Sequence, residues 1–134
     1  MSLNHSPSIV TDGLVLCLDA ANQRSYPKSG TTWSDLAGSN NGTLTNMDAS
    51  NFDQTNGGSL SFDGSNEYVT CGAKSLFEFT TGDSISTSCW VKPTNTSSQT
   101  YQAAFTIGGS ASTLRDRTYQ VRIRNTRQID ALYR

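Results

Sequence analysis

The 134-residue sequence contains little charge, a single histidine and no apolar run long enough to cross a bilayer. Charged residues make up 16% of the chain and the formal net charge is −1, so neither nucleic acid nor a membrane is an expected partner. Because His5 is the only histidine, a metal site built from His and Cys is not expected either.

Cysteines are also few, and their arrangement excludes two common roles. Cys17, Cys71 and Cys89 are too widely spaced for a zinc motif, and their odd number does not fit a closed disulfide framework. Each lies in or beside an apolar, strand-like run, which predicts buried free thiols.

The sequence does contain repeated short alternations of apolar and polar residues. In Ser59–Val69, Leu60 and Phe62 alternate with polar neighbours, Asp63-Gly64 provides turn chemistry, and Tyr68-Val69 resumes a β-favouring run. We therefore predict a strand, a tight connection and a second strand. Similar patterns predict further strands at Leu14–Leu18, Thr43–Met47, Ser84–Val91, Gln102–Ile107, Thr118–Arg124 and Gln128–Arg134.

These segments, with turn signals between them and no long helical period, predict an all-β fold. The expected architecture is an antiparallel β-sandwich over residues 13–134, preceded by a polar N-terminal arm over 1–12. Long polar loops favour a jelly roll over an immunoglobulin-like sandwich. Cys89 should face the core, Trp90 should be buried or lie between sheets, and Gly72–Glu78 should form a short turn or one helical turn.

An ordered set of segments resembles one family. The set is Gly13–Asn22, Tyr26-Pro27, Gly30–Trp33, Asp35-Leu36, Asn41–Thr45, Gly58–Gly64, Glu67–Val69 and Cys89–Pro93. It is similar to the concanavalin A-like, laminin-G-like domains of bacteriophage virion proteins, notably those of marine and cyanobacterial phages. The resemblance implies a jelly-roll sandwich of two curved sheets, and a structural or adhesive role in a tail, fibre or capsid appendage.

Members of this family usually continue with several more strands than this sequence provides. We therefore expect the sandwich to be incomplete because the sequence is part of a longer gene product, or to be completed by a neighbouring subunit. Unpaired backbone groups at an open sheet edge need partners, so a homo-oligomer or a larger virion assembly is the expected state.

Catalysis is not expected from these residues. Glu67 and Glu78 lie in different segments, so no pair of acids shares a strand as glycoside hydrolysis would require. No serine or cysteine has a plausible histidine base. Calcium is the one candidate cofactor, and Asp63, Asn66 and Glu67 are its weak candidate ligands near a turn. The alternative is that Asp63 and Asn66 bond the local backbone.

Two surfaces are candidates for binding a host glycan. One combines Trp33 with Asn40 and Asn41, and the other combines Tyr101 with Asn95 and Gln99. The alternative role for Trp33 is to cap the open end of the core together with Leu36.

Two further segments are candidates for binding a protein partner. Ile9 and Val10 form an apolar tip in the N-terminal arm, and Arg122 and Arg124 share one face of a predicted strand. The arginines belong either to a solvated edge that discourages aggregation or to a surface that docks on an acidic capsid or tail protein. The sequence therefore predicts a noncatalytic virion structural protein, with a glycan-binding adhesin module as the alternative.

Overall fold

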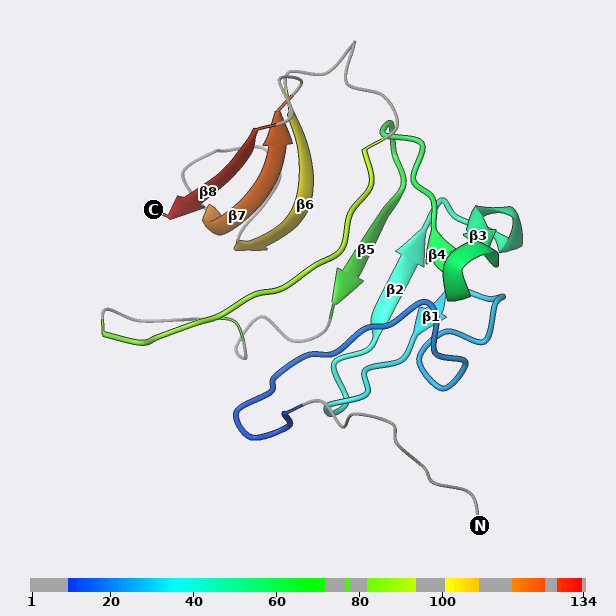
Figure 1. Ribbon diagram of the computed structural model, residues 1–134, viewed down its shortest axis with the longest axis horizontal. Coiled ribbons are helices and arrows are strands. Elements are labelled where there is room, and N and C mark those ends of the chain that lie inside the picture. The colour runs from blue at the N-terminus through cyan, green and yellow to red at the C-terminus, as the bar shows by residue number, and fades with distance from the viewer. Residues whose placement is uncertain are drawn as a thin grey trace. The chain divides into compact units, whose positions relative to one another are not determined.

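The computed structural model describes residues 10–71, 77, 82–93, 101–108, 117–124 and 128–133. The chain divides into two compact units, Met1–Ala73 and Lys74–Arg134. Every strand pairing in both units is antiparallel, and the described residues contain short 3-10 turns but no α-helix (Figure 1). The all-β class is therefore confirmed. Within the same residues, no helix is long and apolar enough to span a bilayer.

The first unit contains two small sheets. In one, β2 (Gly42–Thr45) lies between β1 (Thr32–Trp33) and β5 (Tyr68–Cys71). In the other, β3 (Phe52–Asp53) pairs with β4 (Ser59–Leu60), and this pair is flanked by 3-10 turns at Ala49–Asn51 and Thr55–Gly57. The strand predicted at Thr43–Met47 is thus present as β2.

The connection predicted within Ser59–Val69 differs from the structure in its pairing. Its two strands exist as β4 and β5, but β4 pairs with β3 and β5 pairs with β2, so they do not form a hairpin. The intervening residues are folded back by Asp63, whose carboxylate accepts hydrogen bonds from the N–H groups of Ser65 and Asn66. Gly64 adopts a positive φ of 74° in the same turn, which glycine tolerates without strain.

The prediction of a strand at Leu14–Leu18 was wrong, because this apolar segment pairs with no strand. Its backbone is held by another part of the unit instead. The Cys17 N–H donates to the Asp35 carboxylate at 2.9 Å, and the Cys17 carbonyl accepts from the Leu36 N–H at 2.9 Å. A side-chain acceptor thus replaces a neighbouring strand.

The core of the first unit forms around Tyr26, which lies outside every strand of the unit. Tyr26 is fully buried with Leu44 and Met47, and four half-buried side chains pack against them: Trp33, Phe52, Leu60 and Val69. The rings of Tyr26 and Phe52 lie 5.7 Å apart between centroids. The Tyr26 hydroxyl donates to the Gly30 carbonyl at 3.1 Å, so the buried polar group has a partner.

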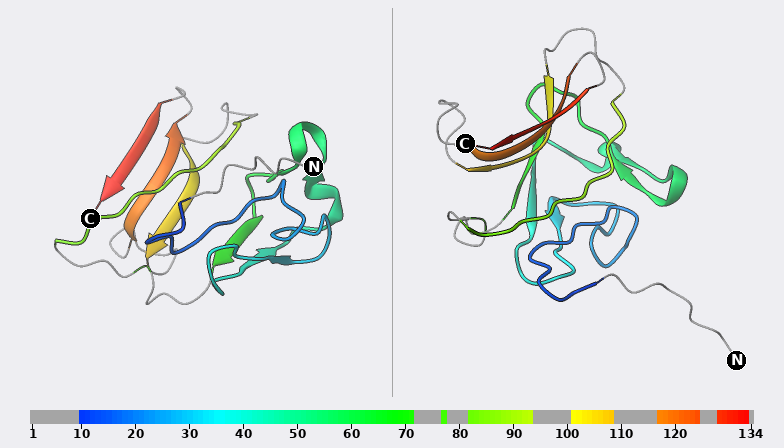
Figure 2. Two further views of the ribbon diagram at one scale, coloured as in Figure 1. Left: turned by 60° about the horizontal axis from the view of Figure 1, so that its bottom comes forward. Right: turned by 60° about the vertical axis from the view of Figure 1, so that its left-hand side comes forward.

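The described residues of the second unit contain one three-stranded sheet. Its strands are β6 (Tyr101–Gly108), β7 (Arg117–Arg124) and β8 (Ile129–Tyr133), with β7 in the centre. They twist together as one curved sheet (Figure 2). The strands predicted at Gln102–Ile107, Thr118–Arg124 and Gln128–Arg134 are therefore confirmed.

The strand predicted at Ser84–Val91 is absent from the structure, which assigns no strand to residues 82–93. The segment lies within the second unit, and its Ile85 and Thr87 line a hollow together with residues of the sheet. Ile85 and Thr87 therefore contribute to the lining of the hollow without forming a ladder. The turn predicted at Gly72–Glu78 lies outside the described residues except for Phe77.

Candidate functional site

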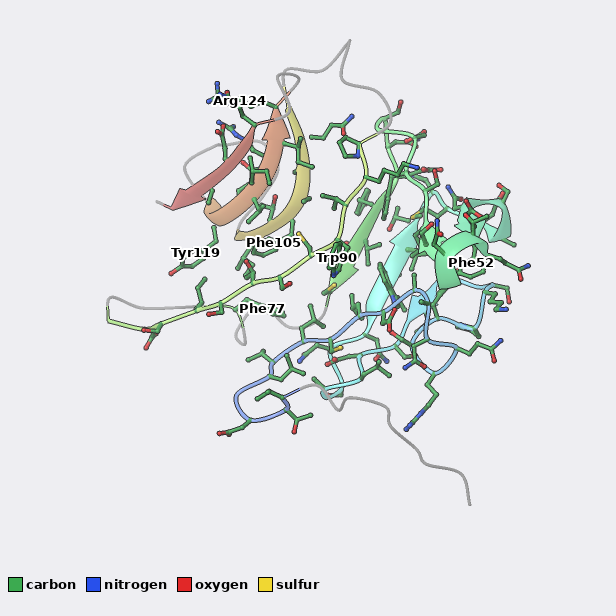
Figure 3. All side chains as sticks on the ribbon, in the orientation of Figure 1. Phe52, Phe77, Trp90, Phe105, Tyr119 and Arg124 are labelled. Atoms are coloured by element: carbon green, nitrogen blue, oxygen red, sulfur yellow. The ribbon has the colours of Figure 1, made fainter. Side chains whose placement is uncertain are left out.

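The described part of the second unit contains a shallow apolar hollow. It has a volume of about 190 Å³ and is lined by Phe105 of β6, by Tyr119 and Val121 of β7, and by Ala131 of β8. Ile85, Thr87 and Gln120 complete its lining. Figure 3 labels Phe105 and Tyr119, which come from neighbouring strands. The register explains this gathering, because Phe105 is opposite Val121 and Val121 is opposite Ala131.

The hollow indicates that the described residues of the second unit cover the apolar face of this sheet incompletely. Phe105, Tyr119 and Val121 are only half-buried, and Ile129 on β8 is 73% exposed. An apolar strand face that stays open in this way is typical of a surface that another protein element covers.

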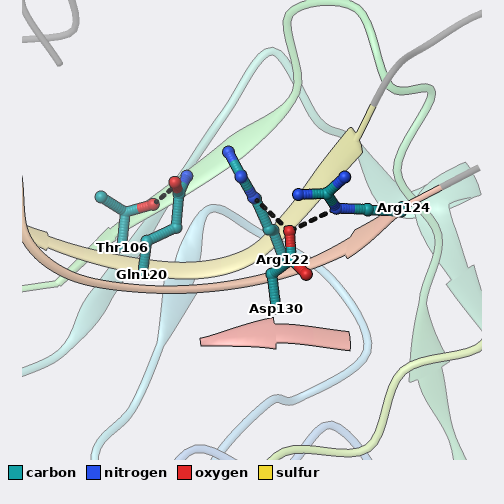
Figure 4. Close-up of polar contacts among 5 residues, drawn as sticks. All are labelled: Thr106, Gln120, Arg122, Arg124 and Asp130. Atoms are coloured by element: carbon teal, nitrogen blue, oxygen red, sulfur yellow. Dashed lines mark hydrogen bonds and ion pairs between the residues drawn. The ribbon is translucent and has the colours of Figure 1, made fainter. Parts of the chain in front are cut away.

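Polar side chains occupy alternate positions of the same strands (Figure 4). The Gln120 amide donates to the Thr106 hydroxyl at 3.3 Å, and the Arg122 and Arg124 guanidinium groups both contact the Asp130 carboxylate. The hydrogen bond from Arg124 is the largest influence on Asp130, and together with Arg122 it holds the pKa of that carboxyl below its usual value. Asp130 is thus ionised at neutral pH.

The two candidate arginines therefore share an acidic partner within the unit. The Arg122 side chain is only 16% exposed, whereas that of Arg124 is 48% exposed. Arg124 consequently contributes more to the outer surface than Arg122. Docking of this pair on an acidic partner remains a prediction, and Arg124 is the better placed of the two.

The two edges of this sheet differ in regularity. The β6–β7 pairing contains register shifts between Ala103 and Phe105 and between Ile107 and Gly108. The β7–β8 pairing runs in register from Tyr119–Tyr133 to Ile123–Ile129. Bulges bend an edge strand and hinder further pairing, so β8 is the edge better suited to accept another strand.

Trp90 and Cys89 lie on the surface, which corrects the prediction that both would be buried. Trp90 is fully exposed, and Val91 beside it is 50% exposed. Cys89 is exposed as well. The alternation in Ser84–Val91 predicted a buried and an exposed face of a strand, but the segment joins no ladder and only Ile85 within it is half-buried. The other two thiols are half-buried, and burial raises the pKa of both Cys17 and Cys71.

The first glycan candidate lies in the first unit, where its residues support the fold. Trp33 is half-buried and packs against the core, with its indole N–H buried and without a hydrogen-bond partner. Asn40 is buried and donates from its side chain to the Val15 carbonyl at 3.3 Å. The Asn41 side chain accepts from the Asp35 N–H at 2.9 Å. Glycan binding by Trp33, Asn40 and Asn41 stays a prediction, and the structure shows that Trp33 is half-buried.

Asp35 organises this region, and the sequence patterns did not reveal it. Its buried carboxylate accepts hydrogen bonds from the backbone N–H groups of Cys17, Ala37 and Asn40, at 2.9, 2.9 and 3.1 Å. Burial alone would raise the Asp35 pKa, but these bonds and one from Gly38 outweigh it, so the pKa lies below its ordinary value.

The weak calcium candidates surround the turn after β4. Asp63 accepts two backbone hydrogen bonds, as the alternative interpretation predicted. The Glu67 carboxylate accepts from the Asp63 N–H and from the Asn51 amide, and the Asn66 carbonyl accepts from the Asn46 amide. These oxygens are already bound to protein donors. Nowhere in the described part of the chain do three His, Cys, Asp or Glu side chains gather as a metal ligand set.

The remaining candidates are only partly visible. Val10 is 81% exposed, whereas Ile9 lies outside the described residues. Tyr101 belongs to β6, but the structure does not describe its side chain. Asn95 and Gln99 lie outside the described residues.

Comparison with known proteins adds no further assignment. No family model, no curated protein and no solved structure matches the chain.

Proposed function

We propose that the chain is a noncatalytic virion structural protein, a capsid decoration or a fibre- or tail-attached β-sandwich that mediates assembly contacts. The observation that carries the proposal is the incompletely covered sheet of the second unit, with its apolar hollow and its regular edge strand β8. The free energy falls when another subunit covers a surface of this kind.

The sequence supports the same proposal independently. Its ordered motifs resemble those of laminin-G-like virion domains, and its weakly charged coat of Ser, Thr, Asn and Gly suits a β-protein of a particle surface. In the proposed complete fold, two stacked sheets form a jelly roll, and neighbouring subunits cover its open edge. The partners are other capsid, tail or fibre proteins and further copies of the chain.

Mass spectrometry of purified particles, combined with chemical cross-linking, tests the proposal. We expect peptides of this chain at a stoichiometric copy number, with cross-links that join it to a capsid, tail or fibre protein. Cross-links from Lys92 would be informative, because this residue is exposed beside Trp90 and Val91. Particles that contain no copy of the chain would contradict the proposal.

A second candidate function is a glycan-binding adhesin module, and the exposure of Trp90 favours it. An exposed indole ring is the usual platform for stacking on a sugar face, and Trp90 presents its whole side chain to solvent. Screening on a glycan array tests this role. Binding that is abolished by Trp90→Ala supports the adhesin, whereas binding to no polysaccharide leaves only the structural role.

A further inference from the structure

The edge strand β8 pairs regularly with β7 on one side, and alternate N–H and C=O groups of its backbone point away from β7. Among the described residues it pairs only with β7, and it does so without a register shift. The direction of its free groups follows from one hydrogen bond, in which the Arg124 N–H donates to the Gln128 carbonyl at 2.8 Å. Bonded and non-bonded pairs alternate in an antiparallel ladder, so the N–H and C=O groups of Ile129 and Ala131 point toward the open edge.

The side chains of β8 fit a second apolar strand. Ile129 is 73% exposed, and Ala131 lines the hollow on the face that carries Val121. The single charged residue of the strand is Asp130, which is held by Arg122 and Arg124. Edge strands are commonly protected by proline, lysine or a bulge, and β8 contains none of these.

We propose that β8 pairs with β8 of a second copy of this chain, antiparallel about a two-fold axis at Ala131. This inference rests on the proposed function and names one of its assembly contacts. Ala131 of the two copies would exchange N–H···O=C bonds, and the two three-stranded sheets become one six-stranded sheet. The same patch serves both partners, as a two-fold interface requires.

The pairing also places side chains of the second copy at the edge of the hollow, and it limits the assembly to two copies. Diagonal neighbours on one face of an antiparallel pair lie about 7–8 Å apart, so Ile129 of the second copy lies next to Ala131 at the edge of the hollow. The outer edges of the six-stranded sheet are then the two β6 strands, whose irregular register against β7 hinders further addition. The expected product is a dimer and not a fibre.

Sedimentation velocity of the purified chain over a dilution series tests the proposal. We expect a dimer that Ile129→Lys and Ala131→Pro each weaken by roughly tenfold or more. The first substitution places a charge on the joined apolar face, and the second removes an outward N–H while sparing the β7–β8 ladder. Ala103→Lys is the matched control, since it adds the same charge on the exposed side of the other edge strand, β6.

Far-UV circular dichroism checks that each variant retains its sheet content, and the two substitutions act on different groups. A monomer at every concentration, or a dimer that both substitutions leave intact, overturns β8 pairing. These results are distinct from failure of the proposed function. A monomeric chain that is still found cross-linked in particles contradicts β8 pairing alone, whereas absence from particles contradicts the proposed function.

Discussion

The carboxylate of Asp35 accepts a hydrogen bond from the backbone N–H of Cys17, 18 residues earlier in the chain, at 2.9 Å. The same buried carboxylate also bonds the N–H groups of Ala37 and Asn40. It therefore joins an apolar segment that has no strand partner to the loop that precedes β2. Removing one acceptor from such a group leaves buried donors without partners, which is costly.

Asp35→Asn tests this role. The asparagine NH₂ group would replace one carboxylate oxygen and would face a backbone N–H that this oxygen accepts from in the native protein. We therefore expect the free energy of unfolding to fall by about 1–3 kcal/mol. Urea unfolding followed by circular dichroism measures the change. Asp12→Asn makes the same chemical change at an exposed residue, and we expect it to alter stability by no more than about 0.5 kcal/mol. Equal effects of the two substitutions would contradict the role of Asp35.

The lowered pKa of Asp35 predicts acid sensitivity. Because the folded state holds the carboxylate ionised more strongly than the unfolded state, its contribution is complete above the unfolded pKa. That contribution is lost as pH falls through the lower pKa of the folded state, below about pH 4. Thermal unfolding at a series of pH values should show a shallower acid limb for Asp35→Asn. Part of the slope should persist, because three other acids also have lowered pKa values: Asp48, Asp63 and Asp130.

The raised pKa of Tyr26 predicts that stability is lost as pH rises, the opposite of the dependence on Asp35. Burial, with a smaller contribution from Asp48, raises the pKa of its hydroxyl, so stability should be lost as pH rises above about 10. Tyr26→Phe removes this titrating group and also the hydrogen bond to Gly30. We expect it to cost about 1 kcal/mol at neutral pH and to flatten the alkaline limb above pH ~10. An unchanged alkaline limb would show that Tyr26 ionises as readily as in the unfolded chain.

Gly42 lies where β2 approaches β5 closely. A Cβ at this position would be 2.7 Å from Cγ1 of Val69, so Gly42→Ala should cost about 1–3 kcal/mol. Gly38→Ala is the control, because its added Cβ would meet only the Asp35 carboxylate at 3.4 Å and its φ is not positive. We expect this control to change stability by no more than about 0.5 kcal/mol in urea unfolding. A larger loss for Gly38→Ala than for Gly42→Ala would contradict the packing of β2 on β5.

The two tryptophans should respond differently to truncation. Trp33→Ala removes a ring that packs against the core and should cost about 2–3 kcal/mol, whereas Trp90→Ala should stay within about 0.5 kcal/mol. Guanidinium unfolding compares the two variants directly. Iodide quenching of fluorescence provides a second test, since the emission from Trp90 should be quenched and that from Trp33 protected. Strong protection of Trp90 in the isolated chain would contradict its exposure.

The strand pattern was the most predictable part of the molecule. Thr118–Arg124 alternates apolar and polar side chains without interruption, and a central strand with two neighbours forms there as β7. The candidate sites were less predictable, because Trp33 and Asn40 belong to residue types that serve a glycan surface and a core loop equally well. Their hydrogen bonds and burial arise from contacts distant in sequence, which no local pattern reveals.

The sequence by itself determined the all-β class and the positions of β2, β6, β7 and β8, because side-chain alternation with period two is a local property. Only the tertiary structure decided that Leu14–Leu18 and Ser84–Val91 join no ladder, that Tyr26 is buried and that Trp90 is exposed. The physical reason is that a strand exists only when its backbone finds a partner, and partners such as the Asp35 carboxylate lie far away along the chain.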